Sequence, residues 1–193
     1  MASDRRIGPS FLFPGVGYGG SCFPKDVKAL VRFAAEQNYR FSILEAVEGV
    51  NDRQKLRLLA KMQAQLGSLK GKRIALWGLA FKPRTDDMRE APAVPLINGI
   101  LAAGATVHAY DPEAMTVARG LFGSKVTFAE NSYAALKGAD ALAIVTEWNE
   151  FREPDFERMK KLLRTPIIFD GRNLYNPDQI RAHGFTYVSI GRP

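Results

Sequence analysis

Arg73-Ile-Ala-Leu-Trp77-Gly78 is the stretch that decides the fold, because it is a short apolar run that a glycine ends at once. Similar runs recur to the end of the chain, and most are separated by segments with helical periodicity. The predicted strands are residues 73–77, 106–110, 126–128, 141–146, 167–169 and 187–190, and the predicted helices are residues 93–103, 113–121, 133–136, 154–163 and 177–183. Strands that alternate with helices predict βαβ units and a parallel sheet. We therefore expect residues 71–193 to form a Rossmann-like α/β domain with five or six strands.

Residues 24–66, upstream of this domain, have the periodicity of two helices. Tyr39 and Arg40 separate the two, and Gly67 ends the second. The apolar positions, which are more than one face needs, are Val27, Leu30, Val31, Ala34, Ile43, Val47, Val50, Leu58, Leu59, Met62 and Leu66. Such a helical segment packs either on a partner subunit or only on its own domain, and the pattern leaves both open.

Charge and composition narrow the function classes. The chain of 193 residues carries a net charge of +7, but its basic residues alternate with acidic ones, which argues against a nucleic-acid interface. We expect Lys55, Arg57, Lys61 and Lys160-Lys161 to be solvated helix faces. A phosphate-bearing small molecule explains the modest positive excess equally well.

The single cysteine excludes an intrachain disulfide and fits a reducing cytoplasm. No metal site is expected, since His108 and His183 lie far apart in the sequence without ligand-spaced neighbours. No apolar run approaches the length of a membrane span, and the first residues lack a signal-peptide apolar region.

The cysteine lies in Gly15-Val-Gly-Tyr-Gly-Gly-Ser-Cys-Phe-Pro-Lys-Asp26, in a glycine-rich and punctuated region that reads as a binding loop. The glycines leave main-chain N–H groups accessible to a ligand, and Pro24 suits the first turn of a helix. Cys22 would then precede a helix N-terminus, whose partial positive charge favours thiolate over thiol. Asp26 would lie about one turn away. A lone cysteine is most often a buried apolar residue, but these flanks indicate a functional one.

The segment that follows the 73–77 strand predicts a nucleotide site without the dinucleotide fingerprint. Gly78 stands where a G-x-G-x-x-G loop begins, but the later glycines are replaced, and Phe81 and Lys82 offer a ring for a base and a cation for phosphate. Arg172 follows another strand at the same edge, where a second cation would clamp a diphosphate. Asp111 could bind a ribose, or it could start an ordinary turn and helix.

Two motifs together resemble the UDP-glucose/GDP-mannose dehydrogenase family: Gly17-Tyr-Gly-Gly-Ser-Cys-Phe-Pro-Lys-Asp26 and Phe81-Lys-Pro-Arg-Thr-Asp-Asp-Met-Arg-Glu-Ala-Pro92. Arg6-Ile-Gly-Pro-Ser-Phe-Leu-Phe-Pro-Gly15 and Asp170-Gly-Arg172 match as well, in the same order. The string from Thr85 to Arg89, with Phe23-Pro24, favours the UDP-glucose branch over the GDP-mannose branch.

The resemblance implies a two-step oxidation of UDP-glucose to UDP-glucuronate with two NAD⁺ per turnover. It implies that Cys22 attacks the intermediate aldehyde and forms a thioester, which water hydrolyses with help from Asp26. The residues that it implies for substrate are Arg6, Phe11, Leu12, Phe13, Pro14, Gly15, Gly19, Phe81, Lys82 and Arg172, with Arg6 reaching across a homodimer. Lys25 and Arg89 are implied for NAD. Residues 1–70 would be the cysteine loop and helical dimerisation segment, and residues 71–193 the UDP-binding domain.

The family also has an N-terminal Rossmann domain with a G-x-G-x-x-G loop and further catalytic residues, which this chain does not contain. The chain thus resembles the C-terminal half of such an enzyme, and we expect little or no activity from it alone. The alternatives are a stand-alone UDP-sugar-binding or dimerisation module, a GDP-mannose-branch member, and a basic nucleic-acid binder.

Overall fold

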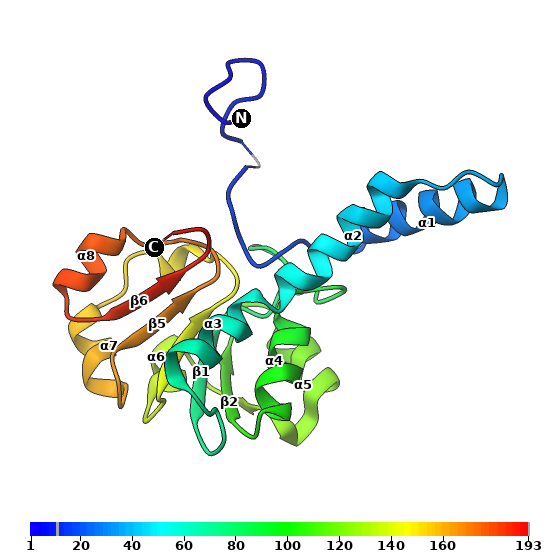
Figure 1. Ribbon diagram of the computed structural model, residues 1–193. Helices are drawn as coiled ribbons and strands as arrows, with labels where there is room; N and C mark the ends of the chain where they lie inside the picture. The colour runs from blue at the N-terminus through cyan, green and yellow to red at the C-terminus, as the bar shows by residue number, and fades with distance from the viewer. Residues whose placement is uncertain (11, 193) are drawn as a thin grey trace.

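A computed structural model describes residues 1–10 and 12–192 (Figure 1). Its centre is a six-stranded parallel sheet in the order β3-β2-β1-β4-β5-β6. The strands are β1 (Arg73–Trp77), β2 (Thr106–Tyr110), β3 (Thr127–Phe128), β4 (Ala141–Ile144), β5 (Ile167–Asp170) and β6 (Thr186–Ser189). The expected Rossmann-like α/β architecture is confirmed, with the larger of the two expected strand numbers.

Helices cover both faces of the sheet, because successive side chains of each strand point to opposite faces. The helices that follow β1 are α4 (Ala93–Ala102), α5 (Met115–Phe122), α6 (Ser132–Leu136), α7 (Phe156–Leu162) and α8 (Pro177–Ala182), with short 3₁₀ turns at Gly123–Lys125 and Asn149–Phe151. Ile74 and Leu76 pack in one apolar core with α4 and α5. Ala75 and Trp77 pack in the other core with α6, α7 and α8.

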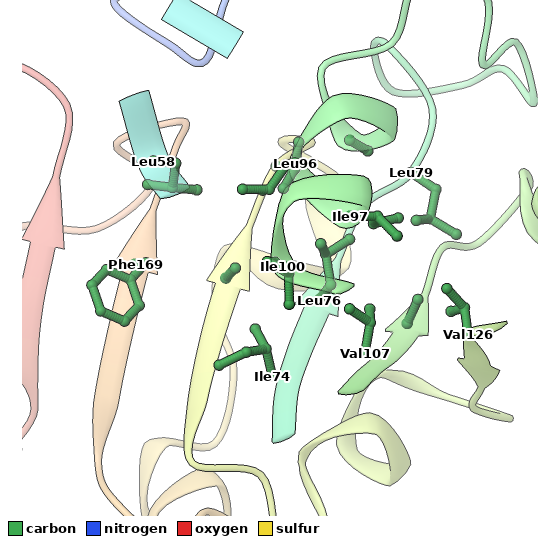
Figure 2. Packing of buried hydrophobic residues seen from close by; sticks show 14 of the residues in the cluster. Leu58, Ile74, Leu76, Leu79, Leu96, Ile97, Ile100, Val107, Val126 and Phe169 are labelled. Atoms are coloured by element: carbon green, nitrogen blue, oxygen red, sulfur yellow. The ribbon is translucent and has the colours of Figure 1, made fainter. Parts of the chain in front are cut away.

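The core beneath α4 explains how the N-terminal helices attach to the sheet. Figure 2 shows Leu58 beside Phe169 of β5, in the same cluster as Leu96 and Ile100 of α4. Leu58 belongs to α3 (Arg57–Leu66), and both it and Met62 are fully buried. The third N-terminal helix is therefore part of the sheet domain's core. The division into units at residues 70 and 71 stays a prediction.

The prediction of one continuous second helix was wrong, since the structure has α2 (Ser42–Lys55) and α3 with a break at Leu56. No glycine or proline marks the break. Leu56, which separates the two helices, has φ −96° and ψ −4°, and beyond it Leu58 and Met62 are buried in the sheet domain's core. Helix α1 (Phe23–Glu36) confirms the first expected helix and the interruption around Tyr39.

Helices α1 and α2 project away from the sheet domain, and residues 1–10 lie apart from both (Figure 1). Large apolar side chains are exposed on this pair and its connection, namely Leu30 and Phe33 of α1, Tyr39 between the helices, and Ile43 and Val50 of α2. Among the described residues, no helix is long and apolar enough to span a membrane.

Candidate functional site

A groove of about 1500 Å³ lies at the carboxyl edge of the sheet. The loops after β1, β4 and β5 form one wall, through Phe81, Lys82, Glu147 and Arg172. The opposite wall comes from the segment before α1 and from α2. Because the chain leaves β1 for β2 on one side and later places β4 on its other side, this is the topological switch point of the sheet, where open α/β sheets bind ligands.

The charged residues among the described lining of the groove are Lys82, Arg172 and Glu147. The ammonium of Lys82 is exposed and lies 5.2 Å from the centre of the Phe81 ring. The guanidinium of Arg172 forms a two-point ion pair with Glu147, with Nε 2.7 Å from Oε2 and Nη2 donating to Oε1 at 2.7 Å. The structure thus brings both predicted cations to one groove. It also adds a carboxylate that holds Arg172 in place.

The segment that contains the cysteine is fastened to α2 through polar side chains. The side chain of Asn51 accepts from the backbone N–H of Tyr18 at 2.8 Å and donates to its carbonyl at 3.2 Å, while Gln54 donates to the carbonyl of Gly15 at 2.6 Å. The hydroxyl of Tyr18 donates to Glu48, and burial followed by this hydrogen bond raises the pKa of that phenol. The loop is therefore rigidly placed.

The same segment packs closely on the loop that follows β1. The N–H of Gly20 donates to the carbonyl of Arg89 at 2.8 Å. A Cβ on Gly19 would lie 2.4 Å from the carbonyl oxygen of Glu90, and one on Gly20 would lie 2.7 Å from the Phe81 ring. The glycines before the cysteine thus permit a loop-to-loop approach. The sequence had suggested an approach to ligand alone.

Cys22 directly precedes α1, as expected, and its side chain is exposed. Its sulfur lies 3.6 Å from the hydroxyl of Ser21, and its carbonyl accepts from the backbone N–H of Asp26 at 2.9 Å. The carboxylate of Asp26 is exposed and lies 3.4 Å from the ammonium of Lys25. Cys22 and Asp26 therefore stand one helical turn apart at the start of α1, and the shared role of their side chains stays a prediction.

Glu90 was missed by the sequence analysis, and Lys55 was misjudged. Oε1 of Glu90 accepts from the ammonium of Lys28 at 2.7 Å, and Oε2 accepts from that of Lys55 at 3.0 Å. The prediction of Lys55 as part of a solvated face was wrong, because its side chain is only 8% exposed. The two hydrogen bonds, that from Lys28 first, hold the pKa of Glu90 below its ordinary range. The burial of Lys55 could not be predicted from the sequence, because its partner Glu90 lies 35 residues away.

Asp111 is fully buried and serves the fold, which decides between its two readings. One oxygen accepts from the N–H groups of Leu79 and Ala80 and from the indole of Trp148, at 2.7, 3.1 and 3.1 Å. The other oxygen accepts from the N–H groups of the next turn, Glu113 and Ala114. With the carboxylate used internally, the ribose interpretation is wrong and the turn interpretation holds.

The predicted site residues fall into three places. Those in the groove are Phe13, Pro14, Gly15, Gly19, Phe81, Lys82 and Arg172. Those outside its described lining are Cys22, Lys25, Asp26 and Arg89 near the start of α1, together with Leu12. Arg6 lies in the projecting N-terminal segment, where it pairs with Asp4 at 2.7 Å. Phe11 lies outside the described residues.

Among the residues that the structure describes, the loop after β1 does not have the form of a dinucleotide site. Gly78 has a φ of +92°, and a Cβ there would lie 2.5 Å from Thr146, so the first loop is filled by protein where a pyrophosphate would need space. Arg89, predicted for NAD, is held by Asp87 through contacts of 3.0 and 2.8 Å, and its hydrogen bond lowers the pKa of that carboxyl. Lys25 and Arg89 are both exposed, and their role toward NAD stays a prediction.

Comparison with known proteins identifies the family to which this sequence is similar. Residues 75–177 match the UDP binding domain of the UDP-glucose/GDP-mannose dehydrogenase family, and residues 1–53 match its central domain. A UDP-glucose 6-dehydrogenase of Pseudomonas aeruginosa is 49% identical over 100% of this chain and 44% of its own length. The UDP-glucose 6-dehydrogenase TuaD of Bacillus subtilis is 44% identical over 98% of the chain and 41% of its length.

Solved structures of dehydrogenases have the same fold as this chain. A UDP-glucose dehydrogenase from Pyrobaculum islandicum superimposes with a TM-score of 0.83 at 34% identity, over 98% of this chain and 41% of its own. A GDP-mannose dehydrogenase of Pseudomonas aeruginosa, at 20% identity and a TM-score of 0.74, shares the fold. The chain spans less than half the length of these relatives, consistent with the C-terminal part of such a protein. The match to the UDP binding domain covers more than half of the chain, and on that basis the chain belongs to the UDP-glucose/GDP-mannose dehydrogenase family.

Proposed function

We propose that this chain is the C-terminal part of an NAD-dependent UDP-glucose 6-dehydrogenase and that its groove binds UDP-glucose. The observation that carries the proposal is the pair of cations, Lys82 and Arg172, at the switch point of a sheet that matches a UDP binding domain. Positive groups favour a bound diphosphate, and Lys82 offers an exposed ammonium for it. The guanidinium of Arg172, which Glu147 holds at two points, adds a second positive group in the same groove. The Phe81 ring beside Lys82 supplies an apolar face for the nucleoside.

The chemistry that we propose centres on Cys22. NAD⁺, held by a part of the enzyme outside this chain, would supply the oxidant that the conversion of the sugar's primary alcohol into a carboxylate requires. The thiolate of Cys22 then adds to the aldehyde carbon and forms a hemithioacetal. Once that adduct is oxidised to a thioester, Asp26 would orient the water that cleaves it, which releases the carboxylate and returns Cys22 as the thiol. Because the residues described form no dinucleotide site, we expect the isolated chain to have little or no turnover.

We further propose that the enzyme is a homodimer and that α1 and α2 form its subunit contact. Leu30 and Phe33 of α1 are exposed and lie outside the described lining of the groove, which gives α1 the apolar character of an interface core. Ile43 and Val50 of α2 are exposed as well, but they also line the groove. Arg6 makes no contact with its own groove in the structure, which leaves it available to a partner's groove.

Calorimetry with UDP-glucose, UDP and GDP-mannose tests the nucleotide site. We expect binding that prefers the uridine ligands and weakens by about tenfold or more in Lys82→Ala, because one charge-assisted contact to phosphate is lost. Lys70→Ala is the matched control, since Lys70 is exposed and lies just before β1, away from the groove. Equal binding of UDP and GDP-mannose would contradict the UDP-glucose assignment.

A second measurement separates the enzyme from a stand-alone binding module. With the upstream half of a relative joined to this chain, we expect NADH formation from UDP-glucose that Cys22→Ala abolishes while calorimetric binding of UDP is kept. Binding without any turnover in that fusion would favour the module.

A further inference from the structure

Glu90 joins three elements that otherwise make little polar contact. Its carboxylate accepts from Lys28 on α1 and from Lys55 on α2, while its own backbone belongs to the loop after β1. Its φ is +53°, a left-handed conformation that an L-residue adopts only where the surroundings enforce it. Gly19 lies so close to the Glu90 carbonyl that a Cβ there would be 2.4 Å from its oxygen, so the cysteine segment packs directly on this residue.

Helix α1 depends on this bridge more than its length suggests. Of its 14 residues, only Pro24, Val27 and Ala34 are buried. Among the residues that the structure describes, the Lys28–Glu90 pair is the one hydrogen bond or ion pair from an α1 side chain to another element. Cys22 is attached directly to the first residue of this helix. The placement of the sulfur therefore follows the placement of α1.

The loop that carries Glu90 also faces the groove. Phe81, Lys82 and Pro83 line the groove, and the N–H of Phe81 donates to the carbonyl of Asp87 at 3.1 Å, which closes the loop on itself. The Arg89 carbonyl then holds Gly20, two residues before Cys22. One compact loop thus contacts the ligand wall on one side and the cysteine segment on the other.

We propose that Glu90 is a positioning residue for Cys22: by bridging Lys28 and Lys55, it holds the thiol in register with the groove beside Lys82. The proposal rests on the proposed roles of Cys22 and the groove, but it can be measured without turnover. Because the chain has one cysteine, alkylation reports on Cys22 alone.

The test measures the rate at which iodoacetamide alkylates the chain, with and without saturating UDP-glucose, together with the Kd for UDP from calorimetry. In the wild type, bound UDP-glucose places its sugar over the thiol and slows alkylation. In Glu90→Gln we expect this protection to fall about three- to tenfold, because a partly exposed charged contact is lost. The Kd for UDP is expected to stay within about twofold, since Lys82 and Arg172 are untouched. A general loss of structure would weaken both measurements together.

Two further variants keep the test decisive. Lys28→Met should reproduce the loss of protection, and the double variant Lys28→Met/Glu90→Gln should lose no more than either alone, because all three break one link. Glu36→Gln is the matched control, since Glu36 pairs with Arg32 within α1 and connects to no other element. Full protection in Glu90→Gln, additive losses in the double variant, or an equal loss in Glu36→Gln would each overturn the proposal.

Hydrogen exchange separates this proposal from the proposed function. Amides of residues 23–36 are expected to exchange faster in Glu90→Gln than in the wild type or Glu36→Gln. If the wild type does not bind UDP-glucose, the proposed function fails, and the Glu90 proposal is decided by exchange alone: unchanged exchange rejects it. Faster exchange confined to α1 supports it.

Discussion

Asp111→Ala is expected to destabilise the chain severely, because the carboxylate is a buried hub of five hydrogen bonds. The substitution leaves four backbone N–H groups and the indole of Trp148 without an acceptor in a position that solvent does not reach. Each unsatisfied buried donor costs about 1–3 kcal/mol. The five losses share one cavity and are not additive, so we expect about 4 kcal/mol in total.

Urea and thermal denaturation measure this loss. For a chain of this size, about 4 kcal/mol corresponds to a fall in Tm of about 8–16 °C. Asp111→Asn keeps the volume and one acceptor oxygen, so its cost is expected to be about half as large. Glu36→Ala is the control, because its exposed ion pair with Arg32 is worth less than about 1 kcal/mol.

The result also decides between a structural role and a ligand role for Asp111. A carboxylate whose role is to bind a ribose would accept few hydrogen bonds in the free protein. Its removal would then leave the free energy of unfolding unchanged and weaken only ligand binding. A loss below about 1 kcal/mol in Asp111→Ala would refute the reasoning from the hydrogen-bond hub. Unchanged UDP affinity in the milder Asp111→Asn variant would support it.

Three other perturbations test separate contacts. Gly20→Ala is expected to lower the Tm and loosen the cysteine loop, because φ is +93° and the new Cβ would lie 2.7 Å from the Phe81 ring; hydrogen exchange of residues 17–22 measures this. Leu58→Ala should cost about 2–5 kcal/mol in urea denaturation, since Leu58 is fully buried between α3 and the sheet. The pKa of Glu90 is depressed in the folded state, so its stabilisation is present above its ordinary value of 4.5 and is lost as pH falls through the folded value. Urea midpoints of the wild type and Glu90→Gln should therefore differ at neutral pH and converge in acid, whereas a constant difference would contradict the assignment.

The centre of the sheet could be predicted from the sequence because β1, β4 and β5 are buried on both faces. Residues 141–144 of β4 and 74–77 of β1 are continuous apolar runs, which are typical of the centre of a parallel sheet. The punctuating glycines and the helical spacing between the runs gave each element to within a few residues. The local pattern is sufficient to predict these central strands, because apolar side chains surround both of their faces.

The break between α2 and α3 could not be predicted, because nothing local causes it. Lys55 and Leu56 are acceptable helix residues, and the apolar positions continue at helical spacing across them. The residues on either side of the break have different tertiary partners: Leu58 packs in one apolar cluster with Phe169, while Lys55 donates a hydrogen bond to Glu90. Only the folded chain brings these partners together.

The candidate site divides along the same line. The residues that we propose to contact ligand or take part in chemistry, such as Cys22 and Lys82, lie in motifs that can be recognised from residue type and spacing. Their supporting residues could not be recognised from the sequence, because Glu147 and Glu90 are acidic residues in loops without a motif. Glu147 pairs with Arg172, 25 residues away, and Glu90 with Lys55, 35 residues away. Local rules fail most where a chain uses strained or buried polar groups, which it does at functional sites. A left-handed, non-glycine Glu90 that neutralises a buried lysine breaks two such rules at once, and this conjunction, found beside the only cysteine, is itself an argument that the loop is built for the thiol.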